Sequence, residues 1–441
     1  MLYMFVRHSQ LPVNQNNVQL LMLILIIALT VAVMKIFSLI QSLEYPYIAY
    51  LAPVAVGAML TTILLNAQLA VVVTVLIGVA ASVVFNSDHV QPFDFKYGLL
   101  AMTNSFAAIF SIQRASQRSS ILKAGIMISL LAMALVGSLV LLDDQETRRS
   151  AMFALSFALG GGLVTAVFVI GLLPFFEVAF GILSPLKLVE LSNPNHPLLR
   201  KLLTETPGTY HHSVMVGNLA EAAAEAIGAD GLLCRVGAYY HDIGKTKRPS
   251  YFIENQTNME NPHDRIDPAL SKSIIVAHAR DGVEMLRDAG IPKPIRDIAE
   301  QHHGTTLLTF FYFKAKKQAE EKGEKPPEEL EYRYPGPNAQ TKEAAIVGIA
   351  DCVEAAVRSL RNPTVEQIDS MVRKIIKNRL DDGQFNECDL TIKELDLVAK
   401  TLNEALLGIF HSRIEYPTAE LPASKPAAIA SVSETKDEVN P

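Results

Sequence analysis

The sequence predicts an all-α protein with two parts, a polytopic transmembrane helical bundle followed by a soluble domain that is also helical. Two observations predict the division: apolar runs that suit a bilayer follow one another through the first part, and charged residues gather in the remainder. Strand signals are weak, so we expect helices in the soluble part as well. We place the bundle at residues 1–186, the helical domain at 187–417 and a disordered tail at 418–441.

Six apolar runs predict the membrane spans. The hydrocarbon core of a bilayer is about 30 Å thick, and the fourth run is only marginally long enough to cross it. Six such runs in succession are not expected of a soluble core. Charged residues are almost absent from their centres, which favours an anchor or sensor over a transporter. The runs lie at residues 20–40, 46–66, 68–86, 97–112, 121–142 and 151–173.

The end of the sixth run contains residues that disturb helices. A glycine triplet at 160–162 and Pro174 interrupt it, so we expect either a kink or a continuation as an interfacial segment to about residue 183. Glu177 lies near the end of this region, and we expect its carboxylate to snorkel to the membrane surface.

The loops between the runs predict the orientation. The loop after the fourth run carries Arg114, Arg118 and Lys123, whereas acidic residues (Asp143, Asp144 and Glu146) open the loop after the fifth. Basic loops face the cytoplasm, and this places residues from 187 onward on the cytoplasmic side. The sequence therefore predicts a multi-pass protein of the cell (inner or plasma) membrane with a cytoplasmic soluble domain.

Charge limits the partners of the soluble part. Eight of the 39 Lys and Arg and seven of the 45 Asp and Glu lie at residues 1–186, which leaves 31 and 38 in the remainder and a net charge of −7 there. Sequence-independent binding of DNA or RNA depends on Lys and Arg that neutralise phosphates, so we expect no nucleic-acid partner. A small anion can still bind where metal ions supply positive charge. The three cysteines lack CxxC spacing and indicate a reducing compartment.

Amphipathic periodicity predicts the helices of the soluble domain. The stretch 314–331 is strongly charged and is expected to form a solvated helix or loop. The segment after Pro417 is rich in Ala, Ser, Pro and Glu, a composition typical of disorder. The amphipathic helices are expected at Val214–Ile227, Leu232–His241, Leu270–Ala289, Pro294–His303 and Ala344–Ser359.

Seven side chains on or directly next to these helices suit metal binding. Imidazoles and carboxylates suit Mn, Fe or Zn. Seven such groups exceed the needs of one ion and match two ions about 3.5–4 Å apart that share a bridging carboxylate. Adjacent ligands diverge by about 100° on a helix, so a His-Asp pair addresses two ions more easily than one. The candidates are His212, His241, Asp242, His278, His302, His303 and Asp351, with His263 as a further residue that could line the site.

Longer motifs then give a specific resemblance. His241-Asp242-Ile-Gly-Lys245 is the signature of the HD phosphohydrolases. The surrounding sequence resembles the seven-transmembrane HD-family cyclic di-AMP phosphodiesterases of the PgpH type through most of residues 190–417, and more weakly through the spans. The motifs that carry the resemblance are Glu205–Ser213, Arg235–Pro249, Gln301–Thr305 and Tyr332–Pro337.

The resemblance implies a two-ion site and a reaction. One ion would be held by His212, His241, Asp242 and Asp351, and the second by His278, His302 and His303, with Asp242 bridging both. The ions would be iron or manganese, and the reaction would be hydrolysis of cyclic di-AMP to linear pApA, with Asp242 and Lys245 as catalytic groups. Lys245 would contact a phosphate oxygen, unless it is a solvated lysine. Thr305 would donate a hydrogen bond to the substrate, with helix capping as the alternative.

Other hypotheses remain open. Cyclic di-GMP or guanosine tetra- or pentaphosphate could be the substrate, although Thr305-Thr-Leu-Leu follows Gln301-His-His-Gly where the cyclic di-GMP branch has Glu and Gly-Tyr-Pro. A receptor that binds a nucleotide without cleaving it is the non-enzymatic alternative. Membrane lipid and, as an open possibility, a second copy of the chain are the other partners.

The chain also departs from the pattern of the family. Its members carry a large extracellular region between an N-terminal membrane helix and the bundle, and that region is not found here. Met1–Val6 followed by Arg7 resembles the end of a missing span, which suggests a shortened member or a fragment.

Overall fold

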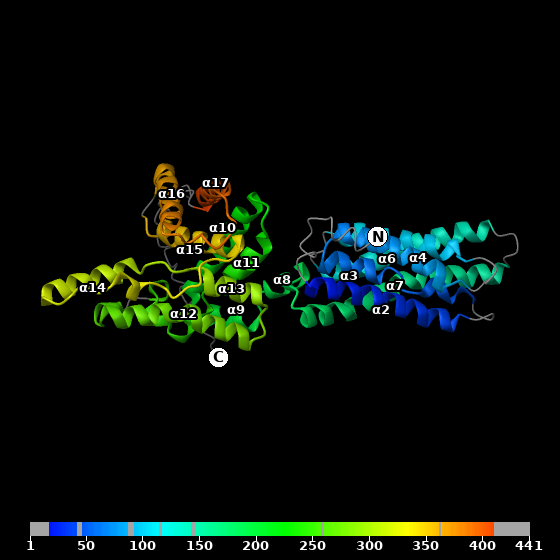
Figure 1. Cartoon of the computed structure of the whole chain (residues 1–441), viewed down its shortest axis with the longest axis horizontal. Helices are drawn as coiled ribbons and strands as arrows, with labels where there is room; N and C mark the ends of the chain where they lie inside the picture. The colour runs from blue at the N-terminus through cyan, green and yellow to red at the C-terminus, as the bar shows by residue number, and fades with distance from the viewer. Residues whose placement is uncertain are drawn as a thin grey trace, which may run out of the picture.

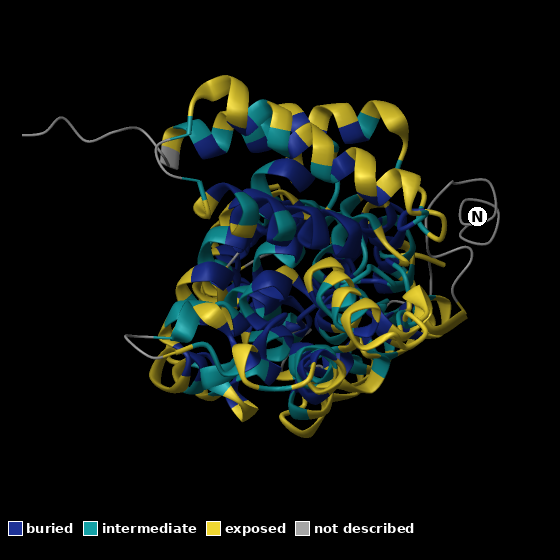
Figure 2. Cartoon of the chain, turned by 90° about the vertical axis from the view of Figure 1, so that its left-hand side faces the viewer, coloured by how far each residue is buried: buried dark blue, intermediate teal, exposed yellow. Residues whose placement is uncertain are grey.

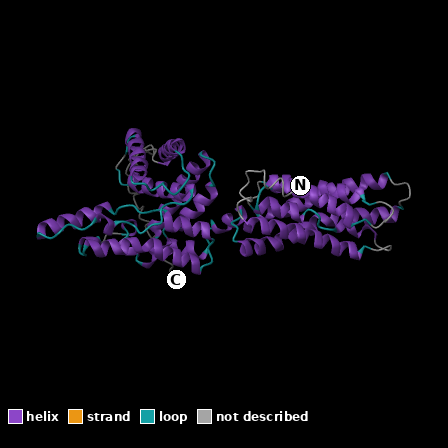
Figure 3. Cartoon of the chain, viewed as in Figure 1, coloured by secondary structure: helices purple, strands orange, loops and turns teal. Residues whose placement is uncertain are grey.

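The computed structural model consists of helices and the loops that join them (Figure 3). In the described part of the chain the only strand-like pairing is an isolated antiparallel bridge between Leu307 and Arg333. The all-α fold class is therefore confirmed. The described residues are 17–41, 46–86, 92–113, 117–142, 147–256, 260–360 and 363–409. Outside them lie the predicted tail at 418–441, residues 1–7 and the loop residues Arg114, Asp143, Asp144 and Glu146.

Two helical bodies lie end to end along the long axis and meet at the short helix α8 (Pro185–Leu191), as Figure 1 shows. The domain boundary predicted between residues 186 and 187 falls within α8 and stays a prediction. The first body, at the right of Figure 1, contains α2 (Asn17–Ile40), η2 (Pro46–Leu51), α3 (Val56–Leu64), α4 (Ala67–Val84), α5 (Phe95–Ile112), α6 (Arg118–Leu141) and α7 (Arg148–Phe180).

The second body, at the left of Figure 1, is built from helices and short 3₁₀ turns. These are α9 (Pro197–Glu205), α10 (Pro207–Ala226), α11 (Gly231–Tyr240), η3 (Ile243–Lys247), η4 (Pro249–Tyr251), η5 (Ile253–Asn255), η6 (Pro262–Asp264), α12 (Pro268–Asp288), α13 (Lys293–Gln301), α14 (Thr309–Lys322), η7 (Glu329–Tyr332), α15 (Lys342–Arg358), α16 (Val365–Asp381) and α17 (Ile392–Ile409).

Five of the six predicted spans correspond to described segments long and apolar enough to cross a membrane. They indicate a membrane protein. The predicted span 97–112 is present as α5, but it is not among the five because the helix also carries Lys96 and Asn104. The five segments are Asn17–Ile40, Tyr47–Leu64, Ala67–Val84, Arg118–Leu141 and Arg148–Phe180.

Helix α7 continues through the residues expected to disturb it. Neither the glycine triplet at 160–162 nor Pro174 ends the helix, which stops only at Gly181 in a left-handed conformation with φ of 62°. The triplet serves close packing instead: a Cβ on Gly162 would lie 2.2 Å from the carbonyl oxygen of Gly125 in α6. The helix thus continues to Phe180, and the interfacial position of its last part stays a prediction.

Glu177 does not snorkel, and this expectation was wrong. Its side chain is buried near the end of α7 and accepts a hydrogen bond from the Ser184 hydroxyl. Ser184 also caps the N-terminus of α8 by accepting from the backbone N–H of Lys187 at 3.1 Å. Helix α7 ends between these two residues, which lets the carboxylate pair with Ser184 inside the protein.

All five amphipathic helices predicted in the soluble domain are present, as α10, α11, α12, α13 and α15. Helix α10 begins at Pro207, seven residues before the predicted start, because its polar first turns hide the apolar periodicity. In the charged stretch 314–331 the α-helix α14 ends at Lys322, where Gly323 has a φ of 69°, and the short 3₁₀ turn η7 begins at Glu329. Apolar faces of these helices meet around residues such as Leu219, Val353 and Leu402. Figure 2 shows buried residues gathered in the interior of the molecule.

Candidate di-metal site

The fold brings together all seven side chains that the sequence predicts as metal ligands. They come from α10, the end of α11, α12, the end of α13, and α15, and all except the half-buried His303 are buried. Within each of two groups, the ligand-type atoms lie within 4.8 Å of one another. The first group is His212, His241, Asp242 and Asp351, and the second is His278, His302 and His303.

The His-Asp pair reaches this position because α11 stops at Tyr240. His241 is the C-cap of the helix, and Asp242 precedes the 3₁₀ turn η3. Gly244 lets this turn approach α12: a Cβ at that position would lie 2.0 Å from the carbonyl oxygen of His278. The glycine of the signature therefore sets how close Asp242 comes to the second group.

Asp242 lies between the two groups. Its Oδ2 atom is 3.2 Å from His241 Nε2 and 3.8 Å from His212 Nε2. Its Oδ1 atom is 3.3 Å from His278 Nε2 and 3.9 Å from His302 Nε2. One oxygen thus faces each group, which is the arrangement of a bridging carboxylate.

Several buried polar atoms of this centre lack a hydrogen bond to any described residue. They are Nε2 of His241, His278 and His302, and both carboxylate oxygens of Asp242. Oδ2 of Asp242 has an ion-pair contact with Lys245. Buried polar groups are nearly always satisfied, and each such atom costs about 1–3 kcal/mol if it stays unpaired. The other four, three imidazole nitrogens and Oδ1 of Asp242, converge on one centre and fit a bound cation.

Most of the imidazoles are oriented by their own segments. His241, His278 and His302 each donate Nδ1–H to the carbonyl oxygen three residues earlier, at 2.6, 2.5 and 2.9 Å. That bond fixes the tautomer and leaves Nε2 as the free lone pair.

His212 has a different partner. Its Nδ1 atom lies 2.6 Å from Oε2 of Glu354, a residue that the sequence reasoning did not select. Glu354 follows Asp351 by three residues on α15, so the two carboxylates share a helix face. The spacing of three residues between Asp351 and Glu354 was the sequence signal that could have pointed to Glu354. It does not show which side chain of another helix the carboxylate meets.

The first group is balanced in charge. Burial lowers the pKa of His241, but the facing Asp242 carboxylate outweighs it and raises the pKa to about 10. Burial of His212 is likewise outweighed by Asp351 and Glu354, which raise its pKa to about 9. Burial raises the pKa of Asp242 and Asp351, yet the imidazoles hold both values well below the usual range. Two cations thus face two anions, and a divalent ion would replace two protons without changing the charge.

The second group is uncharged. Burial, followed by repulsion from His241, lowers the pKa of His302 to about 3. Burial also lowers the pKa of His278, and that of His303 falls well below its usual value. The three rings are therefore neutral near pH 7, which is the form that binds a metal ion.

Lys245 is not a solvated lysine. Its ammonium lies 2.7 Å from Asp242 Oδ2 and 2.8 Å from Glu254 Oε1, and 5.1 Å from the centre of the Phe252 ring. Thr209 donates a hydrogen bond to the same Glu254 oxygen at 3.0 Å. A fixed positive charge therefore stands at the edge of the centre.

Thr305 already has protein partners. Its hydroxyl donates to Asn338 Oδ1 at 2.9 Å and accepts from Gln384 Nε2 at 3.0 Å. Contact with a substrate would require one of these bonds to break, so the substrate role stays a prediction. Nearby, the Tyr334 ring stacks on His303 with 4.3 Å between centroids.

His263 lies outside both metal groups. Its Nε2–H donates to the carbonyl oxygen of Tyr251 at 2.9 Å, and its ring packs between Tyr251 and Phe311. The contacts of this buried histidine fasten η6 to its neighbours.

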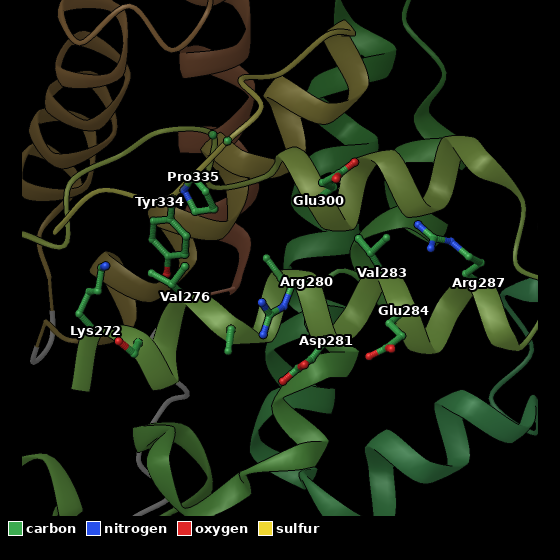
Figure 4. Close-up of a pocket in the computed structure, with 15 residues that line it drawn as sticks. Lys272, Val276, Arg280, Asp281, Val283, Glu284, Arg287, Glu300, Tyr334 and Pro335 are labelled. Carbon is green, nitrogen blue, oxygen red and sulfur yellow. The ribbon is translucent and has the colours of Figure 1, made fainter. Parts of the chain in front are cut away.

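A groove of about 820 Å³ lies on the other side of Tyr334, between α12, α13 and the loop 334–336 (Figure 4). Its charged lining is mixed, with Lys272, Arg280 and Arg287 beside Asp281, Glu284 and Glu300. The seven candidate ligands do not line this groove. Tyr334 separates it from His303.

Comparison with protein families gives two matches. Residues 1–184 match the family described as 7TM receptor with intracellular HD hydrolase, and residues 209–356 match the HD domain.

Two curated relatives are similar over almost the whole chain. The cyclic-di-AMP phosphodiesterase PgpH of Bacillus subtilis (strain 168) is 51% identical over 422 residues, which are 95% of this chain and 58% of the relative. The cyclic-di-AMP phosphodiesterase PgpH of Listeria monocytogenes serotype 1/2a (strain 10403S) is 42% identical over 417 residues, or 94% of this chain and 57% of the relative. The chain thus spans a little more than half the length of these relatives.

Two solved structures are also similar. Both contain the HD domain of the L. monocytogenes phosphodiesterase PgpH, one of them in complex with cyclic-di-AMP. Each is 56% identical to this chain and gives a TM-score of 0.47. The matched region is 49% of this chain and 100% of the solved domain.

Proposed function

Because this chain belongs to the family of 7TM receptors with an intracellular HD hydrolase, we propose that it hydrolyses cyclic di-AMP to linear pApA at a site for two divalent ions. One observation carries the proposal: Asp242 is buried with an oxygen facing each of two histidine groups, and its Oδ1 atom has no hydrogen-bond partner among the described residues. A carboxylate in that state is stable only if cations lie beside it.

We assign the two groups to the two ions. His212, His241, Asp242 and Asp351 would hold one ion, and His278, His302 and His303 the other, with Asp242 shared. Imidazole and carboxylate ligands suit iron or manganese, and we propose these metals. The ions would supply positive charge at the phosphate and lower the pKa of water.

Lys245 would bind the substrate through one of its phosphates. Cyclic di-AMP carries one negative charge on each phosphodiester, and the Lys245 ammonium is held by Asp242 and Glu254 where it can pair with a phosphoryl oxygen. Water adds to phosphorus, the bond from phosphorus to the ribose 3′ oxygen breaks, and that oxygen takes up a proton. The product is a linear dinucleotide with a 5′ phosphate.

We place the catalytic domain in the cytoplasm. Arg118 and Lys123 lie at the start of α6, at the end of the bundle that is joined to the domain by the Arg118–Glu190 ion pair of 2.6 Å. Basic residues favour the cytoplasmic end of a span, so the domain would lie on that side. The bundle would then be an anchor or sensor.

Turnover by the whole 441-residue chain in detergent tests the function. With iron or manganese added, we expect cyclic di-AMP to be converted to pApA faster than cyclic di-GMP or guanosine tetraphosphate is consumed. A chain that retains two ions and cleaves none of these nucleotides would instead be a nucleotide receptor, and the proposal would be wrong.

A further inference from the structure

One of the candidate ligands, His212, is held differently from the others. His241, His278 and His302 donate Nδ1–H to main-chain carbonyl oxygens of their own segments. His212 lies within α10 and uses the side chain of Glu354, which is 142 residues away in the sequence. The orientation of this ring therefore depends on a contact between two helices.

Glu354 and Asp351 hold His212 from its two sides. Asp351 Oδ1 lies 3.0 Å from Nε2, the atom that faces the centre, and Glu354 Oε2 lies 2.6 Å from Nδ1, the atom that faces away from it. The Glu354 side chain is only 9% exposed, and its second oxygen accepts from Arg358 at 3.3 Å. The carboxylate is thus buried, fixed by two contacts and directed at the imidazole.

We propose that Glu354 is a positioning residue for the first of the two ions, a role that rests on the proposed two-ion site. By accepting the Nδ1 proton it keeps His212 in the tautomer whose Nε2 lone pair points at His241, Asp242 and Asp351. A carboxylate acceptor also makes Nε2 a stronger donor than a carbonyl acceptor would. His241, His278 and His302 have carbonyl partners instead, so we expect loss of Glu354 to act on the first ion and to spare the second.

Metal retention by the whole chain in detergent tests this role. Wild type and variants are loaded with manganese, dialysed against increasing chelator, and assayed for ions per chain. We expect Glu354→Ala to keep one ion at chelator concentrations where wild type keeps two, with affinity for the weaker ion lowered by about 10–100-fold. Glu354→Gln keeps an acceptor without the charge, so its loss should be smaller. Glu343→Gln, on the same helix but outside both groups, is the matched control and should behave as wild type.

The identity of the affected ion is tested in a second background. His278→Ala removes a ligand of the second group, and we expect it to leave one ion bound. Adding Glu354→Ala to it should remove that ion as well. If the double variant keeps its ion, Glu354 does not serve the first group and the proposal fails.

A purely structural role gives a different result. Glu354→Ala would then lower the thermal stability of the metal-free protein and still hold both ions at the wild-type chelator concentration, which overturns the proposal. Should Glu354→Ala fail to fold, the isosteric Glu354→Gln decides: unchanged retention of both ions counts against the role. These readouts do not use cyclic di-AMP, so a failure of the proposed substrate leaves them intact.

Discussion

Buried polar groups are treated in opposite ways in the two bodies of the molecule. In the bundle, Thr30, Thr61, Thr74 and Thr165 each donate to the carbonyl oxygen four residues earlier in the same helix, at 2.7 to 2.9 Å. In the HD domain, the Asp242 carboxylate and three imidazoles direct at one another atoms that have no hydrogen bond to a described residue.

This difference between the two bodies indicates that a ligand binds in the second body and not in the bundle. A hydroxyl that bonds to its own helix has no need of a partner from elsewhere, and bilayer-spanning helices must satisfy their polar groups internally. The bundle has exceptions among its described residues, the side chains of Asn104, Ser105 and Ser129, but these are uncharged. Charged groups that are buried and converge on one point mark the candidate metal centre. The predictions below challenge this contrast in order of expected effect.

The largest effect should follow from removing the shared carboxylate. Asp242→Ala should lower turnover of cyclic di-AMP by on the order of 10³-fold or more, because it removes a ligand from both ions. Turnover and metal content of the purified protein are the measurements. Near wild-type turnover would refute the ligand assignment.

The second largest loss of activity should follow from crowding at Gly244, the glycine of the HD signature. In Gly244→Ala the new Cβ would meet the carbonyl oxygen of His278, so η3 must shift and carry Asp242 with it. A displacement of about 1 Å can cost about 100-fold in rate, and we expect a loss of that order in kcat. Gly171→Ala, at a site in α7 where a Cβ meets nothing within 4 Å, is the control. Equal activity of the two variants would argue against the close approach.

Removal of the Lys245 charge should weaken catalysis without emptying the site. Lys245→Met should reduce kcat for cyclic di-AMP by about 10–100-fold, since one stabilising charge is lost while all seven ligands remain. Metal analysis alongside steady-state kinetics separates the two effects. Loss of both ions in this variant would mean that the ammonium supports the centre itself.

Asp281 gives a pH-dependent effect of moderate size. Burial raises its pKa, but hydrogen bonds from Arg248 at 2.7 Å and Lys247 at 3.1 Å outweigh it and lower the pKa below its ordinary value. The carboxylate therefore stabilises the fold above the pKa of an unfolded aspartate, about 4, and this contribution is lost as the pH falls through the lower folded value.

Asp281→Asn should accordingly reduce stability by about 1 kcal/mol near pH 7, and by progressively less below pH 4. Apparent melting temperatures of the metal-free protein across this range are the measurement. If the melting temperatures of wild type and Asp281→Asn instead moved further apart as the pH falls, the contact would not act as proposed.

The bundle should give the smallest effect. Thr61→Val removes a hydroxyl and also its need for the Gly57 carbonyl, so the stability change should stay below about 1 kcal/mol. Thermal unfolding in detergent measures it. A loss of stability larger than that of Asp281→Asn would contradict the contrast between the two bodies.

The sequence by itself determined the fold class, most of the spans and the seven candidate ligands. Composition, apolar run length and the spacing of His and Asp are properties of consecutive residues, so they are visible before the chain folds. Even α5 was recognisable as a helix, and the residues that weaken it as a span, Lys96 and Asn104, are visible in the sequence.

Tertiary structure decided which groups meet. That His212 is held by Glu354, that Lys245 lies between Asp242 and Glu254, and that Glu177 is buried against Ser184 depend on how helices pack. The partner of each side chain comes from another segment of the chain, at a distance that no local pattern encodes. A charge that looks solvated in sequence can therefore be buried and paired in the fold.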